Sequence, residues 1–291
     1  MSSLTNLFDN EDRYQDVYCN GFSRIAMKDV VLKEVSQYFD DNVMKKMTDA
    51  FPADDQFNLL GVGVGEGHHE LHFLKSLGSH FTSIRNVAVE PNQSLFETFK
   101  TNAAAWSSDD KSNHDSRWFT GPLSQFFSEN PLAKCQYNLI SAIHSMYHTG
   151  DLETTFTRLM SMLKDNGIKI IVLSECKLIK ETFLQNTWLP LSFRVTGKSL
   201  SDEIRKVSEQ KGYTVSTKKL DITLDLTDLF DEESELGDKL ADFITCTAYL
   251  RKTASAEKLD ALMSFWRSLC SQEEDGRMRT LSHESIMVIS K

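Results

Sequence analysis

The stretch that decides the fold is NLLGVGVGEGHHELHFL, residues 58–74, in which glycines alternate at positions 61, 63, 65 and 67. An apolar run enters the glycines, and a helix-like pattern leaves them. Because glycine has no Cβ atom, the backbone at Gly63 and Gly65 can approach a ligand closely. The spacing is G-x-G-x-G, whereas dinucleotide-binding domains use G-x-G-x-x-G. The pattern therefore favours a nucleoside that carries an amino-acid tail over a pyrophosphate.

The composition is typical of a soluble globular protein. The chain has 291 residues, of which 40% are hydrophobic and 25% charged, enough for one large domain or two small ones. A net charge of -10 argues against a nucleic-acid partner, which needs a basic face. Five cysteines without a CxxC pair indicate neither a disulfide framework nor a structural zinc site. Without a signal-peptide pattern or a long apolar run, we expect a cytoplasmic protein with no membrane partner.

Strand and helix patterns alternate from residue 57 onward. Strands are predicted at 57–63, 86–90, 116–120, 137–143, 168–175, 213–226 and 284–290. Helical patterns follow the first four of these strands. Alternation of this kind implies a parallel sheet with helices on both faces. We predict an α/β, doubly wound, mostly parallel seven-stranded sheet of Rossmann-like type.

Three helical segments are extra to this sheet, namely 1–50, 177–200 and 227–275. In open α/β sheets, ligands bind outside the carboxyl ends of the strands. We therefore predict a single domain, 1–291, in which these segments form a cap that binds the substrate. A cap that closes the pocket within one chain, without a heptad seam, predicts a monomer.

Several polar residues lie where the strands end. Glu90 is the last residue of the second predicted strand, where a carboxylate can bind both ribose hydroxyls of a nucleoside. His144 and His148 flank Tyr147 after the fourth strand and are candidates for positioning a substrate by hydrogen bonds or for acid–base work. His68 and His72 lie four apart but outside an H-E-x-x-H pattern, so we predict a solvated helix face and no metal site.

Longer stretches resemble a known family. Residues 137–172, with Leu163-Lys164-x-x-Gly167, resemble the region after the cofactor loop in class I S-adenosylmethionine-dependent methyltransferases. The segments NLFDNEDRYQDVY (6–18), VGVGEG (62–67), VEPN (89–92), IHSMYH (143–148) and LTDLFDEESELGDKLADFIT (226–245) resemble the histamine N-methyltransferase family. The match covers nearly the whole chain, and the GDxLxDF stretch that begins at Gly237 is specific to that family.

The resemblance implies S-adenosylmethionine as cofactor. Cofactor-contacting positions of the family match Gly63, Glu90, Ser124 and Ile143, and Gln93 lies near a position where the family uses glutamine. The acidic residue that usually precedes the glycines is Gly61 here, so backbone carbonyls are expected to hold the methionine amino group. Aromatic positions of the family's substrate pocket match Tyr14, Tyr18, Tyr147, Phe183 and Phe243. Aromatic faces attract the cation that forms during nitrogen methylation, by about 0.5–2 kcal/mol per contact.

The methyl acceptor is the least determined part. An acidic position that binds the substrate in the family falls on Met27 or Lys28, and an amide position falls on Ser282, beside His283. We expect N-methylation of a small amine or imidazole similar to histamine. An inward-pointing Lys28 would instead favour a carboxylate-bearing imidazole or amine, such as histidine or a carnosine-like dipeptide. Two further functions stay open, namely a non-catalytic binding protein that retains the fold and an NAD(P)-dependent oxidoreductase, which the glycine spacing disfavours.

Overall fold

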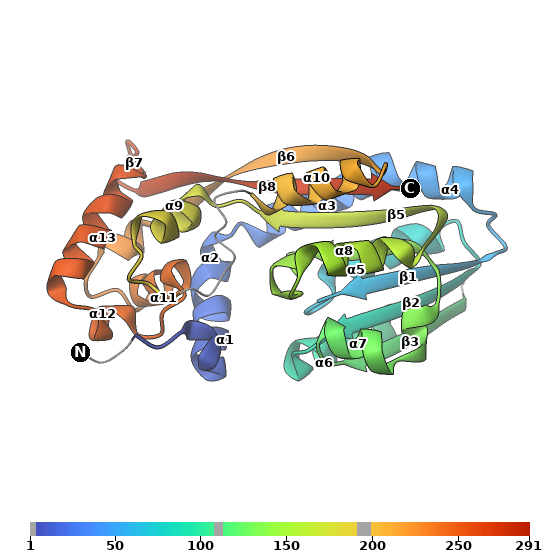
Figure 1. Cartoon of the computed structure of the whole chain (residues 1–291), viewed down its shortest axis with the longest axis horizontal. Helices are drawn as coiled ribbons and strands as arrows, with labels where there is room; N and C mark the ends of the chain where they lie inside the picture. Colours follow the sequence, from blue (N-terminus) through green and yellow to red (C-terminus); the bar gives the residue numbers. More distant parts are fainter. Residues whose placement is uncertain (1–3, 108–112, 191–198) are drawn as a thin grey trace. The chain divides into compact units, whose positions relative to one another are not determined.

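The computed structural model describes residues 4–107, 113–190 and 199–291 (Figure 1). The chain divides into two units, which we treat separately. Unit 1 comprises Met1–Val31, Ser174–Ser199 and Leu220–Glu284, and unit 2 comprises Leu32–Leu173, Leu200–Lys219 and Ser285–Lys291. Of the predicted cap segments, residues 177–190 and 227–275 fall in unit 1, whereas residues 32–50 and Leu200 belong to unit 2. Residues 191–198 of the predicted cap lie outside the described part of the chain.

The sheet has the predicted doubly wound topology. Its strands are β1 (Gln56–Val62), β2 (Ser83–Glu90), β3 (Asn113–Thr120), β4 (Tyr137–Ile143), β5 (Leu163–Ser174), β6 (Thr214–Asp225) and β8 (Met278–Ser290), in the order β3-β2-β1-β4-β5-β8-β6. The pairs β2–β3, β1–β2, β1–β4 and β4–β5 are parallel. A two-residue strand that was not predicted, β7 (Ser271–Gln272), pairs antiparallel with β8. The prediction of a mostly parallel sheet with seven main strands is confirmed.

Helices cover both faces of the sheet in unit 2. Side chains alternate between the two faces along each strand, so neighbouring residues of one strand pack against different helices. Val87 and Val89 of β2 pack in one apolar cluster with α7 (Leu123–Glu129), α8 (Leu152–Ser161) and α10 (Leu200–Gln210). Ala88, between them, packs in another cluster with Phe96 and Phe99 of α6 (Gln93–Ser107). The remaining helices that lie wholly or mostly in unit 2 are α3 (Lys28–Phe39), α4 (Lys45–Ala50) and α5 (His68–Gly78).

Unit 1 is mainly helical. Its helices are α1 (Glu11–Val17), α2 (Ser23–Ile25), α9 (Lys177–Gln185), α11 (Glu235–Thr245), α12 (Leu250–Thr253) and α13 (Ala256–Ser268). Trp266 of α13 is fully buried, and its Nε1 donates a hydrogen bond of 2.8 Å to Thr182 Oγ1 of α9. This bond satisfies the one polar group of a large apolar side chain, so it fixes the packing of the two helices.

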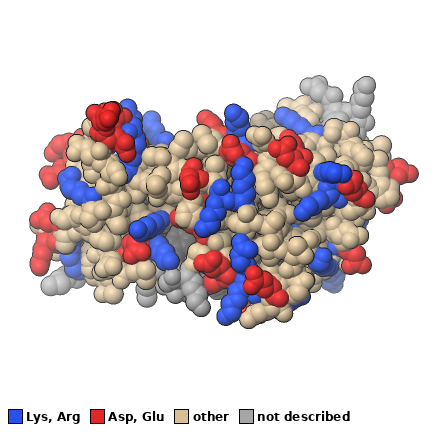
Figure 2. Space-filling view, turned by 90° about the horizontal axis from the view of Figure 1, so that it is seen from above, with Lys and Arg blue, Asp and Glu red and all other residues tan. Residues whose placement is uncertain are grey.

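The surface shows no dominant charge on the face seen in Figure 2, where basic and acidic side chains are interspersed. Across the described residues, none of the helices has both the length and the apolar character that crossing a membrane requires.

Candidate functional site

The glycine loop between β1 and α5 adopts a conformation that only glycine accepts readily. Gly63, Gly65 and Gly67 have φ values of 63°, 55° and 72°, in the left-handed region. A Cβ atom at Gly63 would lie 2.5 Å from Cβ of Ser145, whereas one at Gly65 would meet nothing within 4 Å. The loop therefore packs closely on one side and leaves its backbone at Gly65 open to a ligand.

Glu90, the last residue of β2, holds this loop. Its Oε2 accepts a hydrogen bond of 2.8 Å from the Gly65 N–H, and its Oε1 accepts one of 2.8 Å from the Asn92 N–H. The side chain is buried, and burial raises the pKa of its carboxyl above the ordinary glutamate value. Each oxygen keeps further acceptor capacity, as two ribose hydroxyls would require. The structure thus joins Glu90 to the glycines, while its contact with ribose stays a prediction.

The end of β4 supplies a second edge of the site. Ile143 ends the strand and is 8% exposed, and His144 follows with a positive φ of 52°. The His144 N–H donates to the Val172 carbonyl at 2.9 Å, so β5 fixes its backbone. Ser145 packs against Gly63, and its buried Oγ has no hydrogen-bond partner in the described part of the chain. A buried hydroxyl of this kind indicates a polar partner that comes from a ligand or from water.

The first turn of α5 holds two residues that the sequence alone does not single out, His69 and Glu70. Burial lowers the pKa of His69 to about 3, and His144 acts in the same direction, so the ring is neutral at physiological pH. Its buried Nδ1 has no hydrogen-bond partner among the residues described. Glu70 is 2% exposed and accepts a hydrogen bond of 2.9 Å from Ser141 Oγ of β4. Neither residue is distinguishable by spacing from its solvated neighbours.

The neighbouring histidines behave as surface residues. His68 Nε2 lies 3.0 Å from Glu66, and His72 Nε2 lies 2.9 Å from Asp40. Within residues 4–107, 113–190 and 199–291, no group of three or more His, Cys, Asp or Glu is arranged to hold a metal ion.

Four other predicted residues of unit 2 lie on helices. Gln93 is exposed at the start of α6, and its amide donates to Glu97 of the same helix. Ser124 is exposed on α7. Tyr147 and His148 lie on the short helix η5 (Met146–His148), with ring centroids 6.1 Å apart. The structure therefore does not direct the Gln93 amide toward the glycine loop.

Unit 1 brings three of the five predicted aromatic residues together. Tyr14 and Tyr18 stack with centroids 6.1 Å apart, and Tyr18 lies 6.3 Å from Phe243. Phe22 extends this set, stacked on Phe243 at 4.1 Å. We call these four residues the aromatic group. Phe183 is buried in α9 and has no ring contact with the group in the described residues.

The two candidates for the family's acidic position have different surroundings. Lys28, the first residue of α3, places its ammonium 4.7 Å from the Tyr18 ring centroid. Met27 has a positive φ of 47° and is 39% exposed. A protein cation therefore already lies against one face of the aromatic group.

The candidates on β8 lie beside the end of β5. Ser282 is 2% exposed, and His283 Nε2 lies 3.2 Å from Glu175 Oε2. The next residue, Glu284, is one that the sequence alone does not single out. Burial raises the pKa of its carboxyl to about 8.

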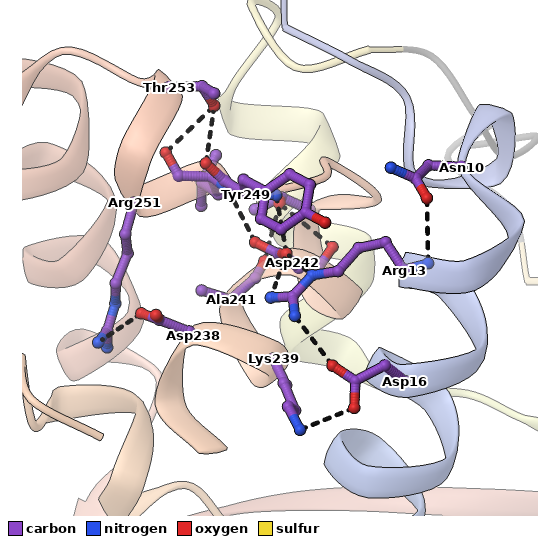
Figure 3. Close-up of polar contacts among 12 residues, drawn as sticks. Asn10, Arg13, Asp16, Asp238, Lys239, Ala241, Asp242, Tyr249, Arg251 and Thr253 are labelled. Atoms are coloured by element: carbon purple, nitrogen blue, oxygen red, sulfur yellow. Dashed lines mark hydrogen bonds and ion pairs between the residues drawn. The ribbon is translucent and has the colours of Figure 1, made fainter. Parts of the chain in front are cut away.

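The GDxLxDF stretch has a structural explanation, shown in Figure 3. Asp242 of α11 is 1% exposed and accepts hydrogen bonds of 2.8 Å from the N–H groups of Tyr249 and Leu250. Arg13 of α1 also contacts this carboxylate, with its Nε 2.8 Å and its Nη2 2.7 Å from Asp242 Oδ2. The carboxylate thus fixes the turn after α11 and joins α11 to α1, while Phe243, the last residue of the motif, enters the aromatic group.

Comparison with known proteins agrees with this architecture. No family model matches the sequence. The chain is 23% identical over 304 residues to histamine N-methyltransferase B of Xenopus laevis, covering 99% of this chain and 98% of that protein. It is 24% identical over 243 residues to histamine N-methyltransferase of Danio rerio, covering 80% and 81%.

Solved structures give the same fold. The YcgJ protein of Bacillus subtilis has a TM-score of 0.53 at 15% identity, covering 88% of this chain and 98% of that one. A putative sarcosine dimethylglycine methyltransferase of Galdieria sulphuraria has a TM-score of 0.50 at 14% identity, covering 97% and 98%. The chain therefore has the class I methyltransferase fold and is similar, along its whole length, to histamine N-methyltransferases.

Proposed function

We propose that the protein is an S-adenosylmethionine-dependent N-methyltransferase that acts on a small amine or imidazole. The observation that carries this proposal is the glycine loop, which Glu90 holds in place and whose backbone at Gly65 is open. The buried Ser145 Oγ and His69 Nδ1 beside it are available to a polar ligand. These features fit a nucleoside with an amino-acid tail, and the full-length similarity to histamine N-methyltransferases supports nitrogen as the acceptor atom.

When bound, the cofactor would supply a sulfonium methyl group for in-line displacement by a neutral nitrogen of the acceptor, with S-adenosylhomocysteine as the leaving group. The protein contributes mainly by holding the reacting groups in position. Glu90 would bind the ribose hydroxyls, and the Gly63–Gly65 backbone would lie against the tail. Alignment of reacting groups contributes roughly 7–11 kcal/mol to such reactions. No strong base is required, because imidazole is mostly neutral at pH 7.

The aromatic group of unit 1 is proposed to bind the acceptor. Faces of Tyr14, Tyr18 and Phe243 suit a flat imidazole or a forming cation. The Lys28 ammonium against Tyr18 favours a second candidate function, methylation of an imidazole or amine that carries a carboxylate. Such an acceptor would pair its carboxylate with Lys28, whereas the ammonium of histamine would be repelled.

Incubation with methyl-labelled S-adenosylmethionine tests the proposal. We expect mass spectrometry to detect a labelled methyl group on an amine or imidazole from a panel that includes histamine, histidine and carnosine. Thermal stabilisation by S-adenosylhomocysteine but not by NADH is also expected. Stabilisation without any methylated product would favour a binding protein, and stabilisation by NADH alone would contradict the proposal.

Replacing Glu90 by Ala should weaken S-adenosylhomocysteine binding by at least about tenfold. The change removes the carboxylate that would accept hydrogen bonds from the ribose, and it leaves the Gly65 N–H without its acceptor. Each charge-assisted hydrogen bond lost in this way is worth about 1.5–3 kcal/mol. Isothermal titration calorimetry measures the affinity directly. Glu153→Ala, an exposed change on α8, is the matched control and should bind as the wild type does. Equal affinity in the Glu90 variant would refute its assignment.

A Lys28→Glu variant should favour histamine over acceptors that carry a carboxylate. The change replaces a repulsive ammonium by a carboxylate and removes the cation from the Tyr18 face, so KM for histamine should fall about 10- to 150-fold. KM for histidine or carnosine should rise. Lys33→Glu, on the same helix, controls for the change in net charge. An unchanged ratio of the two KM values would show that Lys28 does not contact the acceptor.

A further inference from the structure

A histidine and a carboxylate form a pair in unit 1, where β5 ends beside β8. Glu175 is the residue that follows β5, and its N–H donates a hydrogen bond of 2.8 Å to the His283 carbonyl of β8. This bond holds the two residues side by side on neighbouring strands. Their side chains meet as well, because His283 Nε2 lies 3.2 Å from Glu175 Oε2. The function proposed above gives this pair no task.

The pair is shielded at the carboxylate and accessible at the ring. The side chain of Glu175 is 10% exposed, whereas that of His283 is 35% exposed. The surface pair of His72 and Asp40 differs, because there the carboxylate is 43% exposed and the ring 32%. A neutral His283 that donates its Nε2–H to Glu175 keeps the lone pair on Nδ1. The carboxylate therefore fixes the ring and its tautomer, and the ring can be reached from outside.

Two further titratable groups lie beside the pair. Burial raises the pKa of the Glu284 carboxyl on β8 to about 8, and the Glu175 carboxylate adds to the increase. Burial also raises the pKa of the Cys176 thiol, which directly follows Glu175. Both groups are therefore mostly protonated at pH 7, and the carboxylate charge next to the His283 ring is that of Glu175.

The place and the chemistry of the pair suit one kind of methyl acceptor. β5 pairs with β4 in the parallel part of the sheet, and in open α/β sheets ligands bind at the carboxyl ends of such strands. An aliphatic amine is an ammonium ion at pH 7 and has no lone pair, so it must lose a proton before it can attack a methyl group. An imidazole acceptor has no such need, since most of it is neutral. A histidine oriented by a carboxylate is a common means of removing such a proton.

We propose that His283, oriented by Glu175, is the general base that removes a proton from the ammonium group of an aliphatic amine acceptor. This inference rests on the proposed function and deepens it, because it names the acceptor nitrogen. The proton moves from the ammonium to Nδ1 of His283, and the imidazolium donates Nε2–H to Glu175. The amine lone pair then forms the N–CH3 bond while the S–CH3 bond breaks, with its electron pair left on sulfur. The exposed ring afterwards returns the proton to solvent.

Methyl-transfer rates with two acceptors, phenethylamine and imidazole, test the role of His283. His283→Gln should lower kcat for phenethylamine at pH 7 by about 100-fold or more, and it should change kcat for imidazole little. The variant must bind the rare neutral amine, so its rate with phenethylamine should rise about tenfold per pH unit up to about pH 10. The wild-type rate should depend much less on pH. His72→Gln, which breaks a pair of similar ring exposure, should match the wild type throughout.

A second variant separates the positioning residue from the base. Glu175→Gln keeps a hydrogen-bond acceptor for the ring but removes the charge, so kcat for phenethylamine should fall less than in His283→Gln, with KM unchanged. Losses that are equal for both acceptors, or that do not depend on pH, would overturn the role of His283. Methylation of imidazole but not of phenethylamine by the wild type would also overturn it. Absence of any methylated product from the whole acceptor panel would instead overturn the proposed function.

Discussion

A Lys169→Met variant is expected to be more stable than the wild-type protein, by about 3–5 kcal/mol at pH 7 and below. Lys169 lies in β5, is fully buried, and its Nζ has no hydrogen-bond partner among the described residues. Its ammonium lies 4.5 Å from the centroid of the Phe156 ring. Burial lowers the pKa of the ammonium from 10.5 to about 7, because the charged form loses its hydration. Methionine keeps the apolar stem and removes this cost.

The dependence on pH identifies the cause. Between about pH 7 and 10.5 the unfolded chain binds a proton at Lys169 that the folded chain has lost. The destabilisation that this lysine causes in the wild type therefore decreases as the pH rises through that interval. The difference in free energy of unfolding between the wild type and the variant should decrease with it. Guanidinium unfolding between pH 6 and pH 9.5 measures it. Lys206→Met, exposed on α10, should shift stability by no more than about 0.5 kcal/mol. A gap that does not change with pH would mean that Lys169 stays charged in the folded protein.

The sheet was predictable because its signals are local. Apolar strands alternate with amphipathic helices, and the glycine loop marks the first crossover. The start of β5 was not predicted, since the sequence indicates a helix to residue 164 and a strand from 168. In the structure α8 ends at Ser161, and β5 already pairs through Leu163 with Tyr137. The register shifts before Leu139 pairs with Ile168, so the residues between form an irregularity within the strand rather than a connection before it.

The residues of the candidate site were predictable only where their position along the chain, at the end of a strand, already indicates a role. Glu90 ends a strand next to the first glycine loop, and parallel strands bring such ends together. Glu70 and His69 differ, because they lie among polar helix residues and only the tertiary structure buries them. Lys28 could be suspected from the sequence, but its contact with Tyr18 depends on how the first helices pack. Sequence patterns report exposure along one element, not the partner that covers it.

The same limit applies to Asp242, whose partners lie far away along the chain. The sequence marks it as part of a family-specific motif, and a role toward the substrate would be the natural interpretation of such a motif. Its oxygens instead accept hydrogen bonds from Arg13 and from two backbone N–H groups at Tyr249's left-handed turn (Figure 3). The Asp242 carboxylate thus has a structural role within unit 1.

Replacing Asp242 by Ala should lower the free energy of unfolding by about 3–5 kcal/mol, because the change leaves two N–H groups without their acceptor and removes a carboxylate from the largely buried Arg13 guanidinium, which keeps its ion pair with Asp16. Denaturant unfolding measures the loss, and hydrogen exchange should localise it to the amides of α11 and α12. Asp238→Ala is the matched control on the same helix. Its ion pair with Arg251, at 3.2 Å, is partly exposed and should contribute no more than about 1 kcal/mol. In an Arg13→Met background the Asp242 change should cost less, since the Arg13–Asp242 ion pair is already absent there. Equal losses for Asp242→Ala and Asp238→Ala would show that the buried carboxylate does not organise unit 1.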